Sequence, residues 1–284
     1  MKKYSPRDSY SGSLPGSCQK LSSPGWFDTH CHFDFPAFNP DRRAVWQHCE
    51  TLGISGLIVP GVCREQGERL ASFCAGQPWF FALGLHPCFS ERHRMADLDW
   101  LEQVLSTSEC VAVGEFGLHF SRPVDLAVRQ QQRQLFDAQI QLAQQYKLPV
   151  ILHGVGAHDE IIQALRLARF DGGGVVHAFS GSEQQARQYL DLGFCLGLGG
   201  LLLRPNAHRL RRTVQQLPLE AWLLETDAPD MTPAIAASRR NSPVFLPLVG
   251  VALARIKQLT PAALQACQAD SIRKLFFPLS DHPI

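Results

Sequence analysis

Trp26-Phe27-Asp28-Thr29-His30-Cys31-His32-Phe33-Asp34 runs a short apolar segment into two histidines, with acidic residues before and after them. In an extended chain successive side chains alternate between two faces, so His30 and His32 are expected on the same face. Two imidazoles on one face can bind a single metal ion. A His-x-His pair also occurs in ordinary protein surfaces and cores, so the rest of the chain has to decide between the two interpretations.

Length and composition limit the possible fold classes and binding partners. The chain has 284 residues, of which 45% are hydrophobic, and a formal net charge of +1. This length is enough for a sizeable core and falls in the range of one α/β barrel. With so little net charge, a polyanionic substrate would have to be attracted by local contacts. The nine cysteines are scattered and none forms a Cys-x-x-Cys pair, which favours reduced thiols.

The ends of the chain give further expectations. No apolar run approaches the roughly 20 residues of a membrane-spanning helix. The chain begins Met-Lys-Lys, but residues 4–20 are rich in Ser, Gly and Pro and lack the apolar region of a signal peptide. We therefore predict a cytoplasmic protein that does not bind membranes, with a loosely ordered extension over residues 1–24 and one domain over residues 25–279. No sequence feature indicates an obligate protein partner.

Short apolar runs alternate with helical patterns along the chain. The expected strands are Trp26–His32, Gly56–Val62, Phe80–Leu85, Val111–Glu115, Pro149–His153, Val175–Ala178, Phe194–Leu198 and Trp222–Thr226. Near-continuous apolar strands are typical of parallel sheets buried on both faces. The expected helices are Asp41–Leu52, Arg64–Cys74, Ala96–Ser106, Asp125–Tyr146, Ala157–Arg169, Glu183–Leu192, Ala207–Leu217, Pro247 or later to Leu259, and Pro261–Phe277.

This alternation predicts an α/β protein, a (β/α)₈ TIM barrel with a parallel eight-stranded sheet. An open doubly wound sheet also gives βαβα alternation. That fold calls for a phosphate-binding glycine loop after the first strand, where this chain has His-Cys-His instead. Cys31 is expected to face away from the two histidines and to fill core space. In the longest helix, Leu126, Phe136, Ile140 and Ala143 are expected to form the inner stripe.

Candidate metal ligands follow the ends of the predicted strands. They are His30, His32, His86, Glu115, His153, His177 and Asp227. In a parallel barrel all strand C-termini meet at one face, the face that carries the active site. A lone glutamate could be an ion-pair partner and a lone aspartate could cap a turn. A histidine that closes an apolar run is costly to bury unless it is hydrogen-bonded or metal-bound, so together these residues predict a metal site.

The number of ligands points to two ions. Four imidazoles and two carboxylates exceed the three protein ligands that a single catalytic zinc commonly takes. Two divalent cations about 3.5–4 Å apart use the set naturally, and a water held between them loses its proton near neutral pH. The predicted assignment is His30, His32 and Asp227 on one ion, His153 and His177 on the other, and Glu115 bridging. Zn, Mn and Mg are candidates, and the imidazoles favour Zn or Mn. Glu115 and Asp227 are the predicted catalytic residues, Asp227 by orienting the water or receiving its proton.

Six blocks surround these residues. They are Phe-Asp-Thr-His-Cys-His-Phe-Asp (27–34), Gly-Leu-His-Pro (84–87), Val-Gly-Glu-Phe-Gly-Leu (113–118), Leu-Pro-Val-Ile-Leu-His (148–153), Val-His-Ala-Phe-Ser-Gly (176–181) and Leu-Leu-Glu-Thr-Asp-Ala-Pro (223–229). In this order they resemble the TatD family of metal-dependent hydrolases, and the opening block resembles its bacterial TatD-like members. The resemblance covers about residues 26–277. It implies a TIM barrel of the amidohydrolase type, divalent metals and deoxyribonuclease activity, often 3′ exonucleolytic, with ligands His30, His32, Glu115, His153, His177 and Asp227.

The chain departs from the family pattern at a few positions. Family members usually have aspartate where this chain has His119, and a basic residue where it has Gly154-Val155. Asn241-Ser242-Pro243 fits a late family block, but Asp270 stands where asparagine is usual. None of these residues is an expected metal ligand, so hydrolysis is better supported than the choice of substrate.

The expected substrate is DNA, single-stranded or at 3′ ends. A phosphodiester suits two metals, which can hold its attacking and leaving oxygens, and its phosphates need cationic contacts. The predicted substrate-binding residues are His86, His119 and Arg204, and further arginines near the strand ends are Arg122, Arg209, Arg211, Arg212, Arg239 and Arg240.

Two other functions fit the same residues. The same site can activate water against a carbonyl, as in an amide or ester hydrolase such as a deacetylase. Alternatively, the barrel keeps its metals but serves as a non-catalytic nucleic-acid or protein partner, with His119 marking lost chemistry. Nucleotide release from single-stranded DNA that requires Glu115 favours the nuclease, whereas turnover of an amide or lactone without DNA cleavage favours the first alternative.

Overall fold

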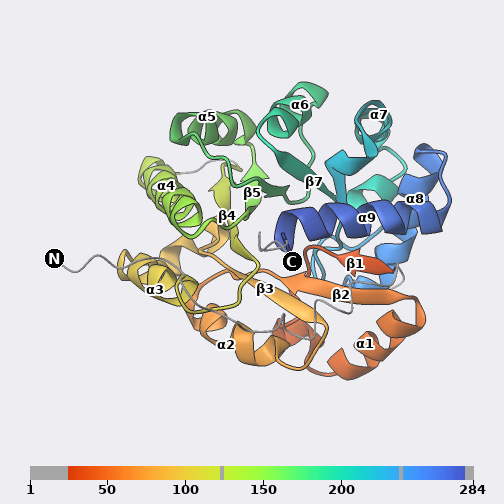
Figure 1. Ribbon diagram of the computed structural model, residues 1–284, viewed down its shortest axis with the longest axis horizontal. Helices are drawn as coiled ribbons and strands as arrows, with labels where there is room; N and C mark the ends of the chain where they lie inside the picture. The colour runs from red at the N-terminus through yellow and green to blue at the C-terminus, as the bar shows by residue number, and fades with distance from the viewer. Residues whose placement is uncertain (1–24, 122–124, 237–238, 279–284) are drawn as a thin grey trace, which may run out of the picture.

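The computed structural model describes residues 25–121, 125–236 and 239–278, and in this part of the chain a parallel barrel is surrounded by helices (Figure 1). Each strand pairs in parallel with the next, in the order β1 to β8. The strands are β1 Trp26–Asp28, β2 Ile54–Val59, β3 Trp79–Leu83, β4 Ala112–His119, β5 Val150–Val155, β6 Gly174–Val176, β7 Phe194–Leu198 and β8 Trp222–Leu224. The TIM barrel predicted from the sequence is confirmed.

Helices connect the strands on the outside of the barrel. They are α1 Arg42–Thr51, α2 Arg64–Cys74, α3 Ala96–Leu105, α4 Leu126–Tyr146, α5 His158–Ala168, α6 Glu183–Asp191, α7 His208–Gln216, α8 Leu246–Ile256 and α9 Pro261–Phe276. The single-turn or short 3₁₀ segments are η2 Pro36–Phe38, η3 Pro87–Arg92, η4 Gly200–Leu203, η5 Leu219–Ala221 and η6 Pro243–Phe245. Local signals set several boundaries. Ser182 and Gln185 form a capping box at α6, and the Thr260 side chain caps α9.

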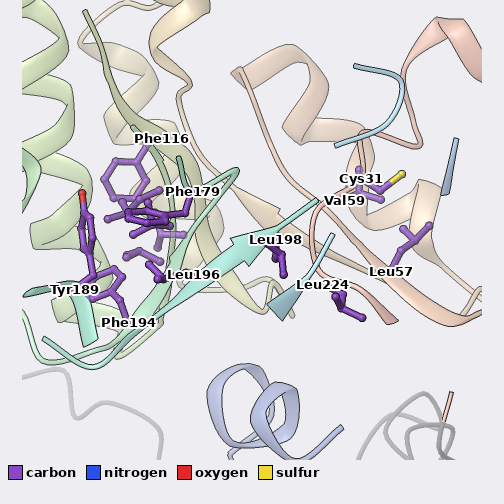
Figure 2. Close-up of a cluster of buried hydrophobic side chains, with 14 of the residues drawn as sticks. Cys31, Leu57, Val59, Phe116, Phe179, Tyr189, Phe194, Leu196, Leu198 and Leu224 are labelled. Atoms are coloured by element: carbon purple, nitrogen blue, oxygen red, sulfur yellow. The ribbon is translucent and has the colours of Figure 1, made fainter. Parts of the chain in front are cut away.

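Two apolar layers hold the barrel. The larger layer lies between strands and helices, and Figure 2 shows part of it, including Phe116, Phe179 and Tyr189. Cys31 is fully buried in this layer, as the alternation of side chains predicted. The second layer is the barrel interior, where strand residues meet Ile272 and Phe276 of α9. In Figure 1, α9 runs across the barrel.

Several expected boundaries are corrected by the structure. β1 ends at Asp28, so His30 and His32 follow the strand instead of ending it. β4 continues to His119, beyond the expected end at Glu115. α8 begins at Leu246, one residue before Pro247, because proline is tolerated in the first turn of a helix.

The expected inner stripe of α4 is correct for three of its four residues. Phe136, Ile140 and Ala143 are buried. Leu126 is 80% exposed, because it is the first residue of the helix and lies ahead of the turns that pack on the sheet.

The predictions about the chain ends, the cysteines and membrane spans can be compared only with the described residues. Residues 1–24 and residue 279 lie outside the described residues, so the extension and the domain bounds stay predictions. No disulfide joins the eight cysteines within the described ranges. In those ranges no single helix has the length and apolar composition needed to cross a membrane. The bent pair Pro243–Ile256 and Pro261–Phe276, which meets at 104°, satisfies that test only jointly.

Candidate metal centre

The barrel brings the predicted ligands together at the C-terminal ends of its strands. His30 and His32 follow β1, Glu115 lies within β4, and His153 lies within β5. His177 follows β6 directly, and Asp227 follows β8. Residues separated by almost two hundred positions thus become neighbours through the topology alone.

Glu115 occupies the middle of this cluster and is almost completely buried. Its Oε2 lies 3.1 Å from His30 Nε2 and 3.5 Å from His32 Nε2. Its Oε1 lies 2.9 Å from His153 Nδ1 and 3.2 Å from His86 Nε2. The two carboxylate oxygens therefore face different halves of the cluster.

Asp227 closes one side of the same cluster. Its Oδ1 lies 3.7 Å from His30 Nε2 and 3.6 Å from His32 Nε2, and its Oδ2 lies 3.5 Å from His177 Nε2. The His30 and His177 rings stack with centroids 3.7 Å apart. Asp227 has a φ of +59°, and its backbone N–H donates to the His30 carbonyl over 2.9 Å. Aspartate is one of the residue types that tolerate this left-handed conformation.

The donor set fits a divalent metal. Both ring nitrogens of His30 are buried without a hydrogen bond, which is costly unless another partner supplies the interaction. Ligands about 2.0–2.1 Å from a tetrahedral metal lie roughly 3.3 Å from one another, close to the separations found around Glu115 and Asp227. Two triads offer ligand atoms within 4.8 Å of each other, namely His30, His32 and Asp227, and His30, Glu115 and His177.

The electrostatics keep both carboxylates anionic. Burial raises the pKa of Glu115, but the surrounding imidazoles, first those of His86 and His30, outweigh burial and hold that pKa well below its usual range. Burial likewise raises the pKa of Asp227, and the nearby imidazoles, His177 foremost, lower it further than burial raises it. Two ionised carboxylates inside a buried cluster are suited to balance cationic charge.

The imidazoles divide into two groups. Burial lowers the pKa of His86 to about 4, against the opposing effect of Glu115. Burial, followed by the neighbouring His177, lowers the pKa of His30. Burial also lowers the pKa of His177, but the carboxylates around it, Glu225 first, outweigh burial and raise that pKa well above its usual value.

Outer contacts orient this first layer of side chains. Glu225 is buried, lies 3.0 Å from His177 Nδ1 through its Oε1, and accepts a 2.7 Å hydrogen bond from the Ala178 N–H. Asp28 accepts from the Thr226 backbone over 3.0 Å and from its hydroxyl over 2.5 Å. Sequence reasoning assigned no role to either acid. The signal for Glu225 was its place two residues before Asp227 on an extended segment, where alternate side chains share a face.

The predicted substrate-binding residues have different surroundings. His86 and His119 belong to the cluster, with His119 Nδ1 2.8 Å from His153 Nε2. Arg204 follows η4 and is exposed. Arg209 donates to the Ser180 carbonyl over 2.7 Å, and Arg240 forms a two-pronged ion pair with Asp41. Arg122 lies outside the described residues.

Comparison with known proteins gives a consistent result. The family model described as TatD related DNase matches residues 27–277. The metal-dependent hydrolase YjjV of Escherichia coli (strain K12) is 43% identical over 209 residues, covering 72% of this chain and 80% of that protein. The 3′-5′ ssDNA/RNA exonuclease TatD of Pantoea sp. (strain At-9b) is 33% identical over 261 residues, covering 88% and 98%. The crystal structure of the E. coli YjjV protein superposes with a TM-score of 0.83 at 36% identity, covering 88% of this chain and 97% of that one.

Proposed function

This chain belongs to the family of TatD-related DNases and is a metal-dependent hydrolase, and from that premise we propose that it hydrolyses phosphodiester bonds of single-stranded nucleic acid from the 3′ end. The observation that carries the proposal is the buried Glu115 carboxylate between four imidazoles, His30, His32, His86 and His153. The Pantoea relative, matched over 98% of its length, is named a 3′-5′ exonuclease of single-stranded DNA and RNA.

Two divalent cations are the proposed cofactors, with zinc or manganese favoured. The residues that would hold them are His30, His32, Glu115, His153, His177 and Asp227. When bound, such ions polarise the phosphoryl oxygens and lower the pKa of water towards 7. The opposed directions of the two Glu115 oxygens support a shared carboxylate.

Asp227 is the proposed proton acceptor. Its side chain is 13% exposed, against 2% for Glu115, so it is the carboxylate that solvent reaches. Its depressed pKa keeps it ionised, with His177 on one oxygen and His30 and His32 on the other. An ionised carboxylate in this position orients a water and takes up its proton during attack on phosphorus.

Substrate phosphates need cations at the barrel mouth. Arg204 is exposed after β7, and Arg209 is fixed against the loop that follows β6 by its hydrogen bond to Ser180. Contacts of this kind position a nucleic-acid backbone without reading its bases. A cytoplasmic location remains part of the proposal, in keeping with eight cysteines in the described ranges that form no disulfide.

The test is release of nucleotides from single-stranded DNA labelled at its 5′ or 3′ end, with Mn²⁺, Zn²⁺ or Mg²⁺ supplied. We expect early loss of a 3′ label and a stepwise shortened 5′-labelled product. Glu115→Gln keeps the shape of the side chain but removes the charge, so kcat is expected to fall at least about 10²-fold. Glu183→Gln, on the exposed face of α6, is the matched control and should retain activity.

Distinct results would overturn the proposal. Metal-replete protein that leaves DNA and RNA intact but turns over an amide or lactone would assign the site to a carbonyl hydrolase. Inertness towards all of these substrates would indicate a non-catalytic partner.

A further inference from the structure

Two phenylalanine side chains at the barrel mouth are half-buried and lie outside the hydrophobic core. Phe35 lies in the turn between β1 and η2, and Phe89 lies in η3 after β3. Among the described residues, neither ring belongs to or packs against the two apolar layers of the barrel, whereas Phe33, two positions before Phe35, is fully buried in the larger layer. Single exposed apolar residues are common, so the contacts of these two rings have to decide whether they serve a ligand.

Phe35 stacks on a proposed metal ligand. Its ring centroid lies 4.6 Å from that of His32, with 26° between the two ring planes, as in other stacked aromatic pairs. His32 Nε2 lies 3.5 Å from Glu115 Oε2 and 3.6 Å from Asp227 Oδ1. The Phe35 ring is therefore one imidazole away from the two carboxylates of the centre. Because this ring is stacked on one side and remains partly exposed, a second flat group can pack against its remaining surface.

Arg42, the first residue of α1, holds the turn that presents Phe35. Its Nε donates to the Phe33 carbonyl over 2.9 Å, and its Nη2 lies 3.0 and 3.1 Å from the Asp34 and Phe35 carbonyl oxygens. The same Nη2 lies 2.8 Å from Asn39 Oδ1, so its two protons are shared among three acceptors. One guanidinium thus fixes three consecutive carbonyls, and the turn is ordered before a substrate arrives. Preorganisation of this kind improves affinity, because less conformational entropy is lost on binding.

Phe89 lies beside the other half of the centre. Its ring centroid lies 5.9 Å from that of His86 at an angle of 73°, an edge-to-face contact, and its backbone N–H donates to the His86 carbonyl over 3.0 Å. His86 Nε2 lies 3.2 Å from Glu115 Oε1. Arg92, which also pairs with Glu65, has its guanidinium 5.9 Å from the Phe89 ring centroid. The two phenylalanine rings thus lie next to histidines that face different oxygens of one carboxylate.

We propose that Phe35 and Phe89 are stacking platforms for unpaired nucleobases, one for each of the two nucleotides that the scissile phosphodiester joins. Every nucleobase has a flat π-face, so stacking on an aromatic ring tolerates any sequence. A base inside a duplex is already paired and stacked on its neighbours, so a single strand presents the free face that this contact needs. The inference rests on the proposed function in one respect, that the substrate is a nucleic acid. It adds that tight binding requires bases and not only a phosphodiester.

The test compares single-stranded oligonucleotides that carry a 5′ fluorophore and differ only at the 3′ end. One strand has all its bases, one is abasic at the terminal nucleotide, and one is abasic at the nucleotide before it. For the wild type with Mn²⁺, each abasic position is expected to raise KM for the first cleavage about 5- to 100-fold, the usual effect of one stacked base. The change in kcat should be smaller, because stacking binds the ground state and the transition state alike.

The variants assign each base to its ring. Phe35→Leu keeps a large apolar side chain but has no π-face, so it should raise KM for the intact strand by a similar factor and become insensitive to one of the two abasic positions. Phe89→Leu should become insensitive to the other position. Phe35→Trp supplies a larger ring and should restore the wild-type response, which a purely structural role of Phe35 would not predict.

Phe277→Leu is the matched control for these variants. Phe277 is a half-buried ring that packs on Phe80 near the start of β3, at the end of the barrel away from the mouth. Its variant should keep the wild-type response to both abasic positions. Equal KM for intact and abasic strands in the wild type, or unchanged sensitivity to both positions in Phe35→Leu and Phe89→Leu, would overturn the inference.

Binding without hydrolysis separates this inference from the proposed function. Fluorescence anisotropy of the same strands, measured with a chelator present, gives their Kd for the full chain. A Kd that depends on the bases and on both phenylalanines, in protein that leaves DNA and RNA intact when metal is supplied, establishes the platforms and disproves the nuclease. Cleavage that does not depend on the bases disproves the platforms and leaves the nuclease standing.

Discussion

The orientation of the His177 ring depends on Gly197, because Gly197 leaves room for the Glu225 side chain that contacts His177. A Cβ placed on Gly197 in β7 would lie 2.2 Å from Glu225 Oε2 and 2.6 Å from its Cδ. Glu225 would have to move, and with it the carboxylate that lies 3.0 Å from His177 Nδ1. The glycine is thus required by a side chain that directly follows the neighbouring strand β8 and not by its own backbone conformation.

Gly197→Ala is expected to lower kcat about 10- to 100-fold, the usual cost of losing an outer partner of a metal-binding histidine, which is the role proposed for His177. The measurement is kcat on single-stranded DNA together with the thermal midpoint of unfolding. Gly199→Ala is the control, since its Cβ would come no closer than 3.3 Å to Glu225. Equal kcat in Gly197→Ala and wild type would show that Glu225 does not orient His177.

At the scale of single residues, the sequence predicts which side chains lie at the ends of strands, but it does not predict where the side chains of a turn point. His153 and His177 were found because each closes an apolar run, so the barrel topology fixes their destination. The position of Cys88 beside His119 could not be predicted, because Cys88 lies in η3, where Phe89 departs from helical geometry and no period indicates the direction of a side chain. Its neighbour His119 was found only as an exception to a family pattern.

Among the elements, an ion pair ties α1 to the loop that precedes η6. Arg240 donates from Nη1 to Asp41 Oδ1 over 2.8 Å and from Nη2 to Oδ2 over 2.7 Å, and its guanidinium lies over the Phe38 ring. The guanidinium of Arg240 lowers the pKa of Asp41 more than partial burial raises it. The ion pair of Arg240, a candidate phosphate contact in the sequence, joins these two segments.

Arg240→Gln is expected to cost about 0.2–1 kcal/mol of unfolding free energy at pH 7, as is usual for exposed pairs. A carboxyl with a depressed pKa contributes stability above its unfolded value of about 3.9, and this contribution is lost as pH falls. The difference from wild type should therefore shrink below about pH 4. Urea unfolding from pH 3 to 7 measures it, and a difference that is independent of pH would assign the effect to Phe38 packing.

Element types were predictable, whereas element ends were predictable only in part: Arg64–Cys74 and Phe194–Leu198 match α2 and β7, but the predicted end of β1 was wrong. The alternation of apolar runs and helical patterns is a property of whole segments, and tertiary structure preserves it. The end of β1 depends on partners far along the chain, since the Thr29 N–H bonds to the Leu224 carbonyl and the Cys31 N–H to the Ile58 carbonyl. These bonds hold the segment beside β8 and β2 after regular pairing has ended, and no local pattern encodes them.

For the whole molecule, metal removal is expected to lower the thermal midpoint of unfolding. A cation that binds only the folded chain adds about 2.7 kcal/mol at 100 times its Kd, which corresponds to roughly 5–10 °C for a chain near this size. Scanning calorimetry with and without a chelator measures the difference, and added Zn²⁺ or Mn²⁺ should reverse it. Because ligands must be deprotonated, the effect should fade in acid.

Glu115→Gln provides the control for this measurement. The variant lacks the carboxylate proposed to be shared by the two cations, so chelator should shift its midpoint much less than that of the wild type. A wild-type midpoint that ignores both chelator and added cation would contradict binding of metal by the folded barrel.

The contacts between β1 and β8 have a consequence for how the protein is made. Asp28 bonds to Thr226, 198 positions later, and Asp227 bonds through its backbone to His30. A ribosome delivers the first of each pair long before the second, so an emerging chain holds His30, His32 and Glu115 before Asp227, the second acid that faces the two histidines, has been made. Joining of the first and last strands therefore also completes the proposed ligand set, and both require that synthesis has passed residue 227.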